Sequence, residues 1–162
     1  MSRRDWFAPL LSAGLVFLAA AAAAAPDLSD AVVAALRGKI ILSRAAVAPG
    51  ASDKETLAKL KAAQLTEVVG LPTDEGQAWR FHYTAFLKKT GNVGLKLRYV
   101  SGEQDRRQAA ESAVPIPDVE SAVLTGELSV SESQGLVRGK VYALQLVNDK
   151  GEIVAKTSAA FK

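Results

Sequence analysis

Apolar and polar residues alternate along most of the chain after residue 65, and this period of two predicts β-strands. The clearest alternation runs through "WRFHYTAFLKK" and resumes after a Lys-Thr-Gly-Asn segment whose residues suit a turn. The two stretches therefore predict an antiparallel hairpin with one buried face and one face in solvent. The buried face would hold Trp79, Phe81, Tyr83, Ala85, Leu87, Val93, Leu95, Leu97 and Tyr99.

Further strands are expected on both sides of this hairpin, at residues 39–43, 122–130, 140–147 and 152–162. The last two flank Asn-Asp-Lys-Gly, which predicts a second hairpin. The polar stretch "SGEQDRRQAAES" is expected to be an exposed loop, and Pro115 and Pro117 mark an edge strand or a connection.

Helical signals are confined to the first part of the chain. Ser52 and Glu55 have the spacing of a capping box, which predicts a helix over about 53–63. A shorter helix can begin at Ser29 or Asp30 and end at Gly38. About seven short strands and one packed helix favour a mainly β fold, an antiparallel sandwich or barrel.

One local motif narrows the fold class. The stretch "LVRGKVY" resembles the L-x-P-G-x-x-Y corner of fibronectin type III and other immunoglobulin-like domains, with Leu136, Gly139 and Tyr142 matching and Arg138 in place of proline. The chain is also similar in plan to small exported bacterial proteins with no assigned activity. The resemblance implies an immunoglobulin-like β-sandwich in which this tyrosine bonds back to the upstream backbone, and it implies no catalytic residues.

The start of the chain has the features of a secretory leader. Arg3 and Arg4 precede an apolar run that passes into alanines, the small residues that a signal peptidase recognises. A membrane anchor is the alternative, but the run is shorter than the ~18 to 20 residues that a spanning helix needs. We expect residues 1–24 to be a signal peptide and 25–162 a single domain, periplasmic or secreted, with no membrane span after cleavage.

Composition excludes several classes of protein. The chain has no cysteine, so disulfides, thiol catalysis and cysteine-bound zinc are unavailable. Its formal net charge is only +3, whereas nucleic-acid-binding domains concentrate far more positive charge. We expect no nucleic-acid partner and no cofactor.

Catalytic chemistry has few candidates. His82 is the only histidine, so a site with two histidine ligands is impossible, and no G-x-S-x-G motif is present to pair with it. Neither a calcium loop nor a phosphate-binding loop is present. Carboxylate pairs in expected loops could serve an envelope hydrolase, which is the alternative function. These pairs are Asp74 with Glu75, Glu103 with Asp105, and Asp118 with Glu120.

Basic residues make the strongest surface feature of the predicted hairpin. On its polar face and tip lie Arg80, His82, Lys88, Lys89, Lys96 and Arg98. Either a third strand supplies acids such as Glu127 and the cations form a solvated lattice of ion pairs, or they face an anionic partner. Self-association through residues 152–162 as an edge strand is a further possibility.

These observations favour an exported binding, accessory or structural module without catalytic activity. Its expected partner is an unknown protein or an anionic envelope polymer, bound through the basic hairpin face.

Overall fold

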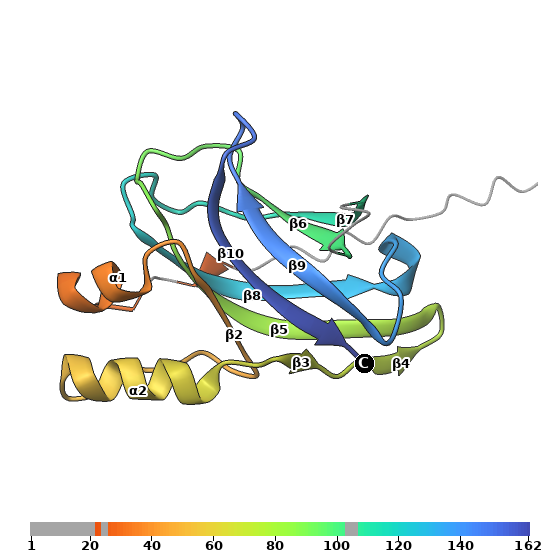
Figure 1. Cartoon of the computed structure of the whole chain (residues 1–162), viewed down its shortest axis with the longest axis horizontal. Helices are drawn as coiled ribbons and strands as arrows, with labels where there is room; N and C mark the ends of the chain where they lie inside the picture. The colour runs from red at the N-terminus through yellow and green to blue at the C-terminus, as the bar shows by residue number, and fades with distance from the viewer. Residues whose placement is uncertain (1–21, 24–25, 103–106) are drawn as a thin grey trace, which may run out of the picture.

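The computed structural model describes residues 22–23, 26–102 and 107–162 (Figure 1). The predicted leader lies outside the described residues except for 22–23. The helices are α1 (Asp30–Leu36), α2 (Asp53–Ala63) and the 3-10 turn η1 (Glu132–Gln134). The strands are β1 (Ala22–Ala23), β2 (Ile40–Ser43), β3 (Glu67–Val68), β4 (Leu71–Thr73), β5 (Gly76–Phe86), β6 (Lys96–Ser101), β7 (Arg107–Ala113), β8 (Val123–Ser131), β9 (Lys140–Val147) and β10 (Ile153–Phe161).

The strands form two five-stranded sheets, so the fold is mainly β, as expected. Sheet I has the order β1-β8-β5-β2, with β4 also paired to β5. Sheet II has the order β3-β10-β9-β6-β7. All pairs are antiparallel except β3 with β10, which makes sheet II mixed. Seven of the described strands have four or more residues, and one of these, β7, lies where the sequence predicts a loop.

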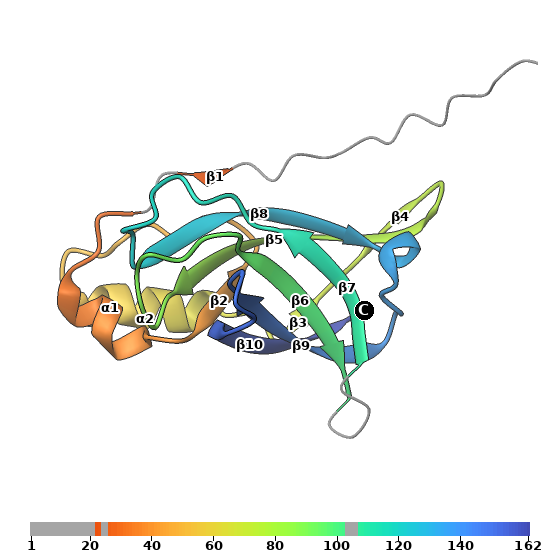
Figure 2. The same cartoon turned by 90° about the horizontal axis from the view of Figure 1, so that it is seen from above.

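The two sheets pack face to face over an aromatic core (Figure 2). Phe161 of β10 lies at its centre, with its ring edge-on to four other aromatic rings. Trp79 and Phe81 come from sheet I, while Tyr99 and Tyr142 come from sheet II. The predicted inward face of β5 is therefore confirmed, and these aromatic residues belong to the core.

The predicted hairpin of β5 with β6 is wrong. β5 belongs to sheet I and β6 to sheet II, and residues 87–95 carry the chain from one sheet to the other. Leu87, just after β5, and Leu95, just before β6, are both buried in the core. The apolar alternation of the two strands therefore continues into the crossing between them. Val93, predicted to be buried, is 48% exposed, whereas Asn92 beside it is buried.

Both helices pack against the outer face of sheet I at one end of the molecule (Figure 1). Val32 of α1 and Leu60 of α2 pack there on Ile41, Phe86 and Val123. This second apolar cluster explains why the alternation in β5 is broken at residue 86, because there both faces of the strand are buried. The helix over 53–63 is confirmed, and the shorter helix at α1 also forms, so two helices pack on the sheet where one was counted.

Both helix starts use the predicted caps. The Ser29 hydroxyl accepts from the Val32 N–H at 3.4 Å, and the Ser52 hydroxyl accepts from the Glu55 N–H at 3.3 Å. The Glu55 carboxylate accepts from the Ala51 N–H at 2.9 Å, one residue before the expected donor. Among the described residues, neither helix is long and apolar enough to cross a bilayer.

Residues 107–113 form β7, although the sequence predicts a loop there. The strand pairs with β6 at the margin of sheet II, where Arg98 lies opposite Glu111. A polar strand of low β-propensity is stable here because its neighbour supplies hydrogen bonds and an oppositely charged partner. The expected connection at Pro115 and Pro117 is confirmed, since residues 114–122 cross from sheet II back to sheet I.

The turn before β9 contains the expected tyrosine contact. The hydroxyl of Tyr142 accepts a hydrogen bond from the Val137 N–H at 2.8 Å, while its ring is fully buried against Phe161. Gly139 adopts a positive φ of 82°, which allows the tight turn between these two residues. The hairpin of β9 with β10 also forms as predicted.

Candidate functional site

The predicted basic stripe is divided between the outer faces of the two sheets. Arg80 and His82 lie on β5 in sheet I, whereas Lys96 and Arg98 lie on β6 in sheet II. Lys88 and Lys89 lie in the crossing between the sheets. The six residues therefore do not form one surface, because the predicted pairing of β5 with β6 is absent.

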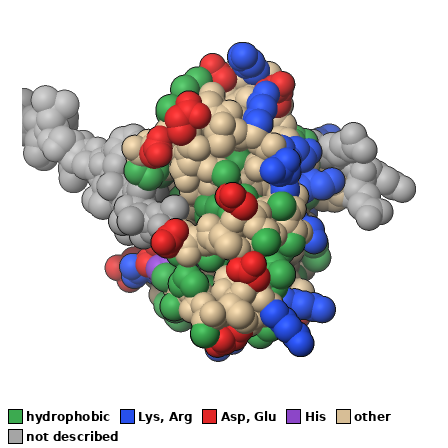
Figure 3. All heavy atoms as spheres, turned by 90° about the vertical axis from the view of Figure 1, so that its left-hand side faces the viewer, with side chains coloured by type: hydrophobic (Ala, Val, Ile, Leu, Met, Phe, Trp, Pro, Cys, Tyr) green, Lys and Arg blue, Asp and Glu red, His purple; other side chains and the backbone are tan. Residues whose placement is uncertain are grey.

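On sheet I, one carboxylate contacts both Arg80 and His82. Glu127 of β8 lies directly across from His82, and its carboxylate is 3.1 Å from His82 Nε2. The same carboxylate forms an ion pair with Arg80. The acid from a third strand, one of the two alternatives considered for the stripe, is thus present on this face. At the helical end of the molecule, acidic and apolar side chains are interspersed over the middle of the view, whereas most of the basic side chains lie toward its right-hand edge (Figure 3).

On sheet II, the balance of charge is different. Glu111 of β7 pairs with both Lys96, at 2.8 Å, and Arg98, at 3.1 Å. The hydrogen bond from Lys96 is the main cause that holds the pKa of Glu111 below its usual value, and Arg98 lowers it further. Sequence reasoning placed Glu111 in a loop, so it could not assign the acid to these cations.

A third cation shares this outer face. The pairing registers align Lys156, Gln145, Arg98 and Glu111 on four neighbouring strands. At about 4.8 Å per strand, the backbones at Lys156 and Arg98 are roughly 10 Å apart. Lys156 is exposed and has no ion pair among the described residues. We call Lys96, Arg98 and Lys156 the cationic face of sheet II.

Lys89 has a structural contact that joins two loops. Its side chain forms an ion pair with Glu152 in the turn between β9 and β10. The Asn148 side chain donates to the same carboxylate at 2.7 Å and accepts from the Glu152 N–H at 2.9 Å. The hydrogen bond from Lys89 is the first cause, and that from Asn148 the second, of a pKa of Glu152 below its usual value. Lys89 therefore fastens the crossing to this turn.

His82 lies between a serine and an acid on the two neighbouring strands of sheet I. Ser43 of β2 lies directly across from His82, on the side opposite Glu127. A nucleophilic serine needs a hydroxyl that can reach both a base and a substrate. Here the Ser43 hydroxyl donates to the Ala45 carbonyl at 2.8 Å, and the residue is only 2% exposed. Ser43, His82 and Glu127 are the residue types of a catalytic triad, but the serine hydroxyl is not accessible to a substrate.

The described carboxylate pairs lie in turns and connections. Asp74 and Glu75 form the tip between β4 and β5, and Asp118 accepts from the Glu120 N–H at 2.9 Å within the connection to β8. The third pair, residues 103 and 105, lies outside the described residues. Over the described part of the chain, no group of three or more histidine, aspartate or glutamate residues is placed to hold a metal ion.

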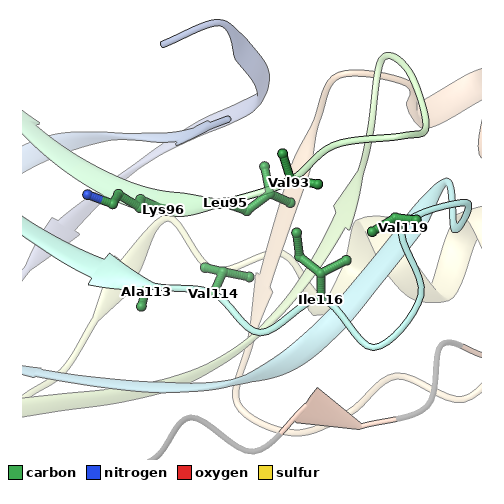
Figure 4. A pocket seen from close by; sticks show the side chains of 8 residues that line it. Val93, Leu95, Lys96, Ala113, Val114, Ile116 and Val119 are labelled. Carbon is green, nitrogen blue, oxygen red and sulfur yellow. The ribbon is translucent and has the colours of Figure 1, made fainter. Parts of the chain in front are cut away.

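A shallow apolar groove of about 440 Å³ lies where the two crossings between the sheets run side by side (Figure 4). The Val114 N–H donates to the Leu95 carbonyl at 3.0 Å and fixes one side of the groove to the other. Val93 and Val119, 48% and 43% exposed, form its rim, and the Lys96 side chain extends away at one end. Sequence reasoning missed this groove, because its walls belong to connections whose approach depends on sheet pairing.

The buried tyrosines add no reactive group to these surfaces. Burial raises the pKa of Tyr83 to about 12 and also raises that of Tyr99, so both stay neutral at physiological pH.

In comparisons with known proteins, no family model, no curated protein and no solved structure matches this chain.

Proposed function

We propose that the mature protein is an exported, non-catalytic binding module with an immunoglobulin-like β-sandwich, and that it binds an anionic partner through the cationic face of sheet II. The proposed partner is an anionic envelope polymer or an acidic protein surface. The surplus of cations over carboxylates on this face is the observation that carries the proposal.

The order of the strands supports the immunoglobulin-like fold. Constant-type immunoglobulin domains have strands A, B and E in one sheet and strands C, F and G in the other. With β2, β5 and β8 in the places of A, B and E, the strands β6, β9 and β10 take those of C, F and G, and β7 lies beside β6 like an added C′ strand. The bond between Val137 and Tyr142 lies near the start of β9, where these domains have their tyrosine corner.

The contrast between the two sheets supports the choice of surface. On sheet I, Glu127 offsets the charge of Arg80, so this face has little attraction for an anion. On sheet II, Glu111 is shared between two cations, and Lys156 adds a third charge roughly 10 Å away. A sheet surface with spaced cations fits a repeating anionic polymer, because several weak contacts can form at once.

The remaining polar groups favour a module without catalytic activity. The Ser43 hydroxyl is buried and bonded to a backbone carbonyl. The described carboxylate pairs lie in a turn tip and a connection, whereas glycoside hydrolysis needs two carboxyl groups facing each other about 5 to 9.5 Å apart across a cleft.

The test uses the mature protein and cell envelopes isolated from the producing cells, with bound protein measured in the pellet after centrifugation. The double variant Lys96→Glu/Lys156→Glu should reduce the bound fraction at least about tenfold, and added salt should release the unsubstituted protein. The matched control is Arg37→Glu/Arg80→Glu, which changes the net charge equally on the side of sheet I and should bind normally.

Two results would contradict the proposal. One is equal binding by the unsubstituted protein and by the Lys96→Glu/Lys156→Glu variant. The other is an equal loss of binding in both double variants, which would mean that net charge alone governs association. Urea unfolding midpoints of all three proteins establish that each is folded in the assay.

A further inference from the structure

The outer edge of β8 is the least protected backbone edge in the described part of the chain. On its other side β8 pairs with β5 over nine consecutive residue pairs without a register shift. On its outer side only β1 pairs with it, through Ala22 opposite Gly126 and Ala23 opposite Thr125 (Figure 2). The outer backbone groups from residue 127 to residue 131 have no strand partner among the described residues.

The residues of β1 belong to the predicted leader. Removal of residues 1–24 would take Ala22 and Ala23 from the edge and leave the outer side of β8 without a strand partner among the described residues. The antiparallel pairing with β1 means that the β8 backbone is extended and oriented to accept another antiparallel strand at this place. The inference rests on removal of the leader and is independent of the cationic face.

The sequence of β8 has few of the devices that prevent strand addition. Natural edge strands are protected by charged side chains, above all lysine, and by proline, bulges or very short length. β8 has nine residues, "VLTGELSVS", with no lysine, no proline and no register shift, and its one charged residue, Glu127, forms an ion pair with Arg80 of the neighbouring strand. By contrast, β7, which lies at one margin of sheet II, contains Arg107 and adjoins a register shift in its pairing with β6. The edge proposed from the sequence, residues 152–162, is unsuitable because β3 pairs with its end and backbone groups of Gly38 and Lys88 hydrogen-bond to Lys156 and Val154 along the rest.

We propose that two mature chains associate through antiparallel pairing of β8 with β8 of a second copy, about a twofold axis at Gly126. A twofold axis perpendicular to a sheet pairs each residue with one of the same face. With the axis at Gly126, Leu124 faces Leu128 of the other copy and Thr125 faces its Glu127. The leucine pair lies on the core side of the sheet, and the Thr125 hydroxyl lies opposite the Glu127 carboxylate. An axis at Glu127 would instead place two Glu127 carboxylates opposite each other, and like charges in that position repel.

Charge substitutions at Thr125 test this register. In Thr125→Glu, two pairs of like charges would face each other across the axis, and the dimer Kd should rise about fivefold or more. In Thr125→Lys, both pairs become opposite charges and the Kd should fall by a similar factor. The control is Ser158→Glu on the exposed face of β10, which should leave the Kd unchanged.

The experiment uses protein purified after export of the full-length chain. Its intact mass shows whether residues 22–24 are absent, and sedimentation equilibrium over a wide range of concentrations gives the Kd. Hydrogen exchange of the unsubstituted protein is a second measurement, in which amides of β8 should exchange more slowly as the dimer forms.

Several outcomes would overturn the proposal. They are retention of Ala22 and Ala23 in the exported protein, a monomer at every concentration, and a dimer whose β8 amides gain no protection. A dimer equally sensitive to both signs of charge at Thr125, or insensitive to both, would exclude the register at Gly126. In the last case the apolar groove would be the surface to examine next.

Discussion

Replacing Phe161 with alanine should remove a large part of the free energy of unfolding. The ring is completely buried, and its centroid lies 5.6 Å from those of Trp79 and Tyr142 and 6.0 Å from that of Tyr99. A buried Phe→Ala change costs about 3–5 kcal/mol, and the loss of several edge-on aromatic contacts places this case near the upper end. Because domains of this kind are stable by only about 5–15 kcal/mol, the variant should be marginally folded.

Urea unfolding followed by the fluorescence of Trp79 measures this change, with a chain of residues 25–162 in which Trp79 is the only tryptophan. With a urea dependence of about 2 kcal/mol per molar, the midpoint should fall by roughly 2 M. The matched variant Phe161→Leu keeps most of the volume and should lose less than half as much. A Phe161→Ala midpoint within about 0.5 M of the unsubstituted value, at an unchanged slope, would refute the central place of this ring in the core.

Two further predictions concern single hydrogen bonds and charges. Tyr142→Phe keeps the ring and leaves the Val137 N–H without its acceptor, so the free energy of unfolding should fall by about 1–2 kcal/mol in the same urea assay; an unchanged value would mean that water replaces the bond. Glu111 has a lowered pKa in the folded state, so its charged form stabilises the fold above a pH of about 4.5, and this contribution is lost as the pH falls through the folded pKa. Glu111→Gln should therefore flatten the decline of the urea midpoint in acid, and an identical pH profile would contradict this assignment.

Local features of the fold could be predicted because they depend on near neighbours along the chain. The alternation around Trp79 gives the buried face of a strand whatever its partners are. Ser52 caps α2 through a donor three residues away, and Gly139 permits the turn before Tyr142. These features need no knowledge of the rest of the molecule.

Sheet pairing could not be predicted in the same way. Leu87 and Leu95 continue the alternation through the crossing, so a connection between two sheets looks like the arms of one hairpin. The wrong pairing of β5 with β6 also made the predicted candidate site wrong, because strand pairing decides whether Arg80 and Lys96 share a surface. β7 was missed since its stability comes from β6 and not from its own residues.

The location of β10 has a consequence for the order in which the protein can fold. This strand joins β3 and β9 in sheet II, and its Lys156 N–H donates to the Gly38 carbonyl at the opposite end of the domain sequence. Phe161 also contacts aromatic rings of both sheets, so the aromatic core is incomplete until β10 is in place. Contacts so distant in sequence form late, because a long loop must close first. Under the proposed export through a narrow channel, the chain would thus stay open until nearly all of it has emerged, and folding would be completed on the far side of the membrane.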